Sequence, residues 1–88
     1  MFCIIWFDFR GTDAELKEVD KAYKTGAEKT KGVDFLGRYT SWGSKWNWSY
    51  FFKLDNIGVM DEFFKNVKYK RDYNKMPYGA VEFFVEPS

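Results

Sequence analysis

The sequence predicts an α+β fold in which one antiparallel sheet of four strands has two helices on one of its faces. Three separate stretches alternate apolar and polar residues with the period of two that is typical of strands, and a fourth is a short run that is apolar on both faces. Two further stretches carry apolar residues at helical spacing, and the order along the chain is strand, helix, strand, strand, helix, strand. The length of 88 residues predicts a single domain over residues 1–88.

The first strand is expected over residues 2–10. Its odd positions, from Cys3 to Phe9, are all apolar, and so are Phe2, Ile4 and Trp6 on the other face. A strand that is apolar on both faces is typical of the centre of a sheet that is covered on both sides. Only Asp8 and Arg10, at the end of the strand, interrupt the second apolar face.

The first helix is expected to begin at about Asp13. Thr12 is followed three residues later by Glu15, the spacing of a capping box, in which each residue binds a backbone N–H at the helix start. The apolar stripe of this helix is narrow and consists of Leu16, Val19, Tyr23 and Ala27. One side of the helix is therefore expected to pack on a core, with the other side in water.

Residues 33–55 predict a pair of strands joined by a turn at Gly43 and Ser44. In the second of these strands, one face carries Trp46, Trp48, Tyr50, Phe52 and Leu54. The opposite face carries Asn47, Ser49, Phe51, Lys53 and Asp55. The first face is expected to be continuous core.

A second helix is expected from Val59 to about Lys70, with apolar residues at helical spacing. The last strand is expected over residues 80–86, where Val81, Phe83 and Val85 share one face. The complete order of elements is that of a ferredoxin-like βαββαβ fold. In this fold Val81, Phe83 and Val85 are expected on the face that the helices cover.

Two helices can cover only one face of this sheet, so the other face is predicted to be open. It receives Ile4, Trp6, Asp8, Arg10, Asn47, Ser49, Phe51, Lys53, Glu82, Phe84 and Glu86. Its aromatic residues Trp6, Phe51 and Phe84 form a larger apolar patch than a monomer usually exposes. The sequence therefore predicts a homodimer that is formed through the open faces.

The composition excludes several classes of site and partner. Histidine is absent and Cys3 is the only cysteine, so a histidine-dependent triad, a histidine-ligated zinc or haem, and an internal disulfide are excluded. We expect no cofactor and no metal. The net charge of +1 and the short apolar stretches predict neither a nucleic-acid partner nor a membrane partner, and the cytoplasm is the expected location.

At this point the chain resembles the dimeric α/β barrel superfamily, in which two such sheets face each other. The resemblance rests on the topology, the two-sided first strand and the segment FFKLDN, which leads into an aromatic second helix. It implies a ligand site inside the barrel or between sheet and helices. Members of the superfamily include cofactor-free monooxygenases, isomerases, decarboxylases and haem-degrading enzymes, and the last of these depend on histidine.

The expected activity is binding of a small aromatic or apolar molecule, and whether the protein is an enzyme stays open. The candidate ligand-binding residues are Trp6, Asp8, Arg10, Tyr39, Phe51, Lys53, Glu82 and Phe84. A carboxylate on a half-buried face can act as a general acid or base, which makes Asp8 and Glu82 the catalytic candidates. The alternative for these charges is a structural network of ion pairs across strands or across the dimer.

Two other functions remain open at this stage. The chain resembles cofactor-free monooxygenases, which surround an aromatic substrate with Asn, Trp and Tyr side chains. The residues of these types are Asn47, Trp48, Trp6, Tyr39 and Tyr50. However, Asn47 and Trp48 are neighbours on a strand and point to opposite faces. RNA-recognition motifs share the topology and stack bases on open-sheet aromatic residues, but Asp8, Glu82 and Glu86 would repel phosphates.

Overall fold

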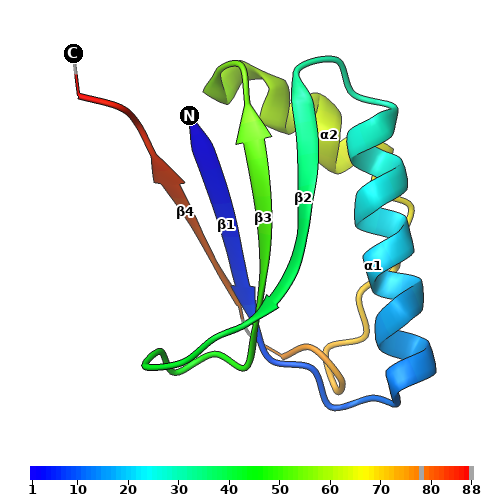
Figure 1. Ribbon diagram of the computed structural model, residues 1–88. Coiled ribbons are helices and arrows are strands. Elements are labelled where there is room, and N and C mark those ends of the chain that lie inside the picture. The colour runs from blue at the N-terminus through cyan, green and yellow to red at the C-terminus, as the bar shows by residue number, and fades with distance from the viewer. Residues whose placement is uncertain (78, 88) are drawn as a thin grey trace.

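The computed structural model describes residues 1–77 and 79–87 of the chain. Four strands and two α-helices follow each other in the predicted order, with one short 3₁₀ helix before the second α-helix (Figure 1). Their bounds are β1 (Phe2–Phe7), α1 (Asp13–Glu28), β2 (Val33–Thr40), β3 (Trp48–Leu54), η1 (Ile57–Val59), α2 (Met60–Asn66) and β4 (Gly79–Phe84). Within the described residues, no helix is long and apolar enough to cross a membrane.

The four strands form one sheet in the order β2-β3-β1-β4, and each strand runs antiparallel to its neighbours. Both helices lie on the same face of this sheet (Figure 1). The predicted α+β fold is therefore confirmed, and its topology is consistent with a ferredoxin-like fold. Strand β1 occupies a central position, as its two apolar faces predicted, with Cys3 and Ile4 both buried.

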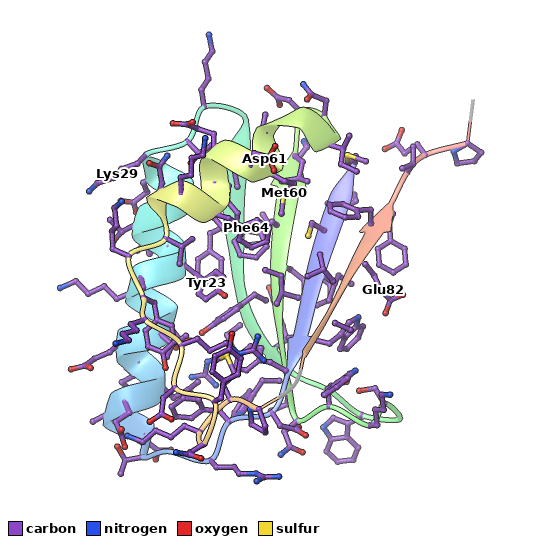
Figure 2. The ribbon with its side chains drawn as sticks, turned by 180° about the vertical axis from the view of Figure 1, so that it is seen from behind. Tyr23, Lys29, Met60, Asp61, Phe64 and Glu82 are labelled. Atoms are coloured by element: carbon purple, nitrogen blue, oxygen red, sulfur yellow. The ribbon has the colours of Figure 1, made fainter. Side chains whose placement is uncertain are left out.

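The core lies between the sheet and the helices and is built largely from aromatic rings. Tyr50, Phe52 and Phe63 are fully buried, and the rings of Phe52 and Phe63 lie 4.9 Å apart in an edge-on arrangement. Tyr23 reaches from α1 into this layer, with its ring 4.8 Å from that of Tyr50 (Figure 2). Burial of the Cys3 thiol raises its pKa to about 11, so this thiol is a small core residue rather than a nucleophile.

The start of α1 agrees with its sequence. The Thr12 side chain accepts a hydrogen bond from the Glu15 N–H at 3.2 Å, and the Glu15 carboxylate accepts one from the Thr12 N–H at 3.0 Å. The predicted capping box is therefore confirmed. Gly26 lies where α1 approaches the end of α2, and a Cβ added there would be only 2.7 Å from Val67 Cγ2.

Strands β1 and β3 are shorter than predicted at the same end of the sheet. Strand β1 ends at Phe7 rather than Arg10, and β3 begins at Trp48 rather than Trp46. The Asp8 carboxylate accepts a hydrogen bond from the backbone N–H of Asn47 at 2.7 Å. A side chain therefore replaces the strand pairing at this point, which leaves Arg10 and Asn47 outside the strands.

Helix α2 also ends early, at Asn66 instead of about Lys70. Val67 already has an extended backbone, with φ −79 and ψ 104. From there the chain runs to strand β4, which begins opposite Phe7.

Strand β4 differs from its prediction in burial. Val81 and Phe83 lie opposite Ile5 and Cys3 and therefore share the face that carries the helices, as expected. Yet Val81 is 45% exposed and Phe83 is 37% exposed, and Val85 lies beyond the end of the strand. The expectation that the helices cover these residues is wrong, because both helices lie on the side of β2 and β3 (Figure 1).

Candidate functional site

The sheet face opposite the helices, called the open face below, carries a continuous row of apolar side chains. Each strand contributes to this row, which consists of Phe2, Ile4, Trp6, Leu36, Tyr39, Phe51 and Phe84. Leu36 shares the face of Asp34 by simple alternation, and Tyr39 joins this face because the register of β2 shifts by one residue between Phe35 and Gly37. Phe2, Leu36, Tyr39 and Phe84 are between 39% and 51% exposed.

Two hollows lie side by side on the open face and share Phe51. The first, which we call the tryptophan hollow, has a volume of about 400 Å³ and is lined by Trp6, Tyr39, Thr40, Ser41, Trp42, Ser49 and Phe51. The second has a volume of about 310 Å³ and is lined by Phe2, Ile4, Leu36, Phe51 and Phe84. The rings of Tyr39 and Phe51 meet edge-on at 5.0 Å, which fixes the wall of the first hollow.

The polar atoms around the tryptophan hollow are few. The Tyr39 hydroxyl donates to the Leu36 carbonyl at 3.2 Å, and the Ser49 hydroxyl donates to the Tyr39 carbonyl at 3.2 Å. The indole Nε1 of Trp6 is buried and has no acceptor among the described residues. A buried donor without a partner costs about 1 to 3 kcal/mol, so this N–H favours any acceptor that comes within reach.

Trp42 stands on the rim of the tryptophan hollow, in the loop between β2 and β3. Its side chain is 94% exposed, although Trp is normally among the more buried residues. Gly43, the next residue, has φ +83, and no other atom lies near the position of a Cβ there. The loop therefore holds a large aromatic side chain in water beside a hollow that is lined by other aromatic rings.

The structure brings together some of the residues that the sequence predicted for a ligand site. Trp6, Tyr39 and Phe51 line the same hollow, and Phe84 joins Phe51 in the neighbouring one. Lys53 lies at the far end of the open face, opposite Phe2. The sequence prediction did not indicate Trp42 as a site residue, because Trp42 lies in a loop, and it assigned no face to Leu36.

The predicted group of charges does not form a cluster. Asp8 and Arg10 follow the end of β1, whereas Glu82 lies opposite Ile4, which is four residues or about 13 Å of extended chain from Asp8. Glu82 is exposed, and its side chain points away from the helices (Figure 2). The two carboxylates that were the catalytic candidates therefore lie too far apart to act on one bond.

A polar network on the helix side was not anticipated from the sequence. Asp20 of α1 accepts a hydrogen bond from the Tyr50 hydroxyl at 2.6 Å and one from Arg38 Nε at 2.8 Å. The Arg38 guanidinium also lies 4.1 Å above the Trp48 ring. Burial and the bond to Asp20 raise the pKa of Tyr50, so its hydroxyl stays a donor and not a proton acceptor.

This arrangement separates the residues that the monooxygenase alternative would combine. Trp48 and Tyr50 face the helices, Trp6 and Tyr39 line the open face, and Asn47 lies in the loop before β3. The five residues therefore do not surround one cavity. Among the residues that the structure describes, no three His, Cys, Asp or Glu side chains lie close enough together to hold a metal ion.

Comparison with known proteins yields no matching family model, no similar curated protein and no similar solved structure.

The contact of Asp8 with Asn47 predicts a structural role for this carboxylate. Replacing Asp8 with Ala leaves the Asn47 N–H without its acceptor at the base of the β2–β3 loop. We expect Asp8→Ala to lower the free energy of unfolding by about 1 to 2 kcal/mol, as measured by urea denaturation. Glu82→Gln, which removes an exposed carboxylate that bonds to none of the described residues, is the matched control and should stay within about 0.5 kcal/mol.

An Asp8→Ala variant with the same free energy of unfolding as the unchanged protein would contradict the structural role of Asp8. The hydrogen bond to Asn47 would then not hold the loop in place.

Proposed function

We propose that this protein is a homodimer formed through its open faces, and that it binds a small aromatic or apolar molecule between the two sheets. The observation that supports the proposal is the exposure of Phe2, Leu36, Tyr39 and Phe84 on one face. A large side chain of this kind has a total surface of about 150 to 250 Å². The exposed fractions of these four side chains therefore add up to roughly 400 Å² of apolar surface.

This area matches what a stable interface requires. A standard interface buries about 800 Å² on each partner, a little more than half of it apolar. At about 25 cal/mol per Å², burying the apolar part contributes roughly 10 kcal/mol per subunit, against an association cost of about 4 to 15 kcal/mol. A second copy also supplies a surface of the same shape and polarity, which is the usual basis of two-fold dimers.

The tryptophan hollow gives the dimer a place for a ligand. Small-molecule sites are commonly about 300 to 1,000 Å³ in volume and mainly apolar, with a few polar groups that orient the ligand. The residues that line this hollow include no charged side chain. An uncharged, flat molecule therefore fits the lining best, because aromatic side chains surround it.

The charges on the open face disfavour RNA as the occupant. Lys53 lies opposite Asp34 across the β2–β3 pair, and Glu82 lies on β4. Phosphate binding depends on an excess of basic residues, which these three side chains do not provide. The aromatic surface is therefore better matched by another apolar surface than by a polyanion.

Replacing Phe84 with Lys should dissociate the proposed dimer. A charge placed within an apolar interface loses its hydration without a partner, which costs several kcal/mol. We expect light scattering of dilute protein to give the mass of two chains for the unchanged protein and of one chain for Phe84→Lys. Leu36→Lys, at the opposite edge of the open face, should have the same effect.

Phe64→Lys provides a matched control, since Phe64 and Phe84 are each 46% exposed. Phe64 lies on α2, on the helix side of the sheet (Figure 2). This variant should remain a dimer. A mass of one chain for the unchanged protein would overturn the dimer and favour single-stranded RNA as the partner of the open face.

Trp42 should contribute to ligand binding without contributing to stability. We expect Trp42→Ala to weaken the binding of 2-naphthol, a flat probe with one hydroxyl, roughly tenfold in calorimetric titrations, because one stacking surface is lost. Its melting temperature should stay close to that of the unchanged protein, since the side chain is 94% exposed.

Trp46→Ala tests whether any loop tryptophan has this effect. Trp46 belongs to the same loop but does not line the tryptophan hollow. This variant should bind 2-naphthol as the unchanged protein does. Equal binding by all three proteins would show that the hollow is not the site.

A further inference from the structure

The two edges of the sheet are protected to different degrees. Strand β2 forms one edge, where the register shift at Phe35 and Gly37 and a φ of +124 at Gly37 interrupt the regular backbone. Strand β4 forms the other edge, pairs with β1 in an uninterrupted register, and contains neither Pro nor Lys. Bulges, prolines and lysines are the usual devices that keep an edge strand from pairing with another chain.

The hydrogen-bond pattern shows which backbone groups of β4 are free for such pairing. The Leu54 N–H donates to the Met1 carbonyl at 2.9 Å, so these two residues form a hydrogen-bonded pair. Such pairs alternate along an antiparallel ladder, so Cys3 and Ile5 bond to β3. The residues between them, among them Ile4, therefore direct their backbone groups towards β4.

The same alternation continues into β4. Ala80, Glu82 and Phe84 lie opposite Trp6, Ile4 and Phe2, so their backbone groups bond to β1. The backbone N–H and C=O groups of Val81 and Phe83 must then point away from the sheet. In Figure 1, β4 is the outermost strand on its side, with no other described element beyond it.

The side chains next to these free groups are apolar and partly exposed. Val81 and Phe83 lie on the helix side, 45% and 37% exposed, and Val85 is 68% exposed. An edge that offers free backbone groups between exposed apolar side chains favours the addition of another apolar strand. Glu82 is the single charged residue within β4.

We propose that the β4 edge pairs with β4 of a second copy of this chain, antiparallel and about a two-fold axis at Phe83. The occupant is a second copy because this pairing closes: each molecule has one unprotected edge, and a two-fold pair uses both of them. The joined sheet then ends at a β2 strand on each side, where the register shift interrupts the edge.

Electrostatics and side-chain packing select the register. An axis at Glu82 would place two carboxylates directly opposite each other, which is destabilising. An axis at Phe83 instead places Phe83 opposite Phe83 of the partner copy, and Val81 opposite Val85 of the partner copy. Glu82 then lies opposite Phe84 of the partner copy, so no like charges face each other and all exposed apolar residues of the helix side form one row.

This interface is separate from the open-face dimer and does not depend on it. It uses the backbone of Val81 and Phe83 and their side chains on the helix side, whereas the open-face dimer uses Phe2, Leu36 and Phe84. A strand of six residues buries less surface than a standard interface, so the pairing should depend on protein concentration.

Amide hydrogen exchange measured residue by residue by NMR tests the proposal directly. Within β4, the amides of Ala80, Glu82 and Phe84 should be protected at every protein concentration, because they bond to β1. The amides of Val81 and Phe83 should be protected in concentrated protein and should exchange faster on dilution. Fast exchange of these two amides at every concentration, with the other three protected, would overturn the proposal.

A pair of proline variants keeps the test independent of folding. Val81→Pro removes only an outward N–H, so β4 should stay on the sheet while protection of the Phe83 amide in concentrated protein is lost. Glu82→Pro removes an N–H that bonds to β1 and should release β4, with loss of protection at Ala80 and Phe84. Retained protection of Phe83 in Val81→Pro would also contradict edge pairing.

Disulfide formation between introduced cysteines tests the register. The native Cys3 is buried and does not compete for this reaction. Hydrogen-bonded partners lie about 5.5 Å apart between Cα atoms, within the range of a disulfide. Phe83→Cys should therefore form a disulfide-linked dimer under mild oxidation. Val81→Cys should not, because its two copies would be about 13 Å apart along the strands; the opposite result would exclude the axis at Phe83.

Discussion

Strand β1 needs cover on both of its faces, and the two helices supply cover on only one. On the helix side, Cys3, Ile5 and Phe7 are buried under α1, α2 and the segment that follows them. On the open face, Ile4 and Trp6 lie beside side chains of the sheet and of the β2–β3 loop, with no described helix over them. The exposed aromatic surface, the two hollows and the proposed dimer all follow from this imbalance.

The helix side is held in place by more than apolar packing. Asp20 links α1 to Arg38 on β2 and to Tyr50 on β3, so one carboxylate fixes the helix relative to two strands. This contact lies towards the β2 edge of the sheet, and so do both helices (Figure 1). The consequence appears at the other edge, where β4 remains uncovered on both faces.

The sequence alone predicted much of the fold because the relevant signals are local. Alternation of apolar residues located three strands and a short apolar run located the first, and the Thr12–Glu15 spacing located the start of α1. The ends of elements were less predictable, because they depend on contacts between distant segments. Asp8 replaces strand pairing at Asn47, and α2 ends at Asn66, next to Val67, which lies against Gly26 of α1.

The candidate site was predictable only in part, for a similar reason. Strand alternation correctly placed Trp6 and Phe51 on the same face, since a face assignment needs only the period of two. It gave no information on Trp42 in the loop, on the face of Tyr39 beyond the register shift, or on the spacing of Asp8 and Glu82. Those positions depend on the pairing register and on loop conformation, which a single sequence does not specify.

The central claim is that a second copy covers the open face, and isotope-filtered NMR on a mixture of labelled and unlabelled protein tests it most directly. Nuclear Overhauser effects between the two kinds of chain report only contacts between copies. The account predicts such contacts among the ring protons of Phe51 and Phe84 and the methyl groups of Leu36. A spectrum in which these protons show contacts only within their own chain would contradict it.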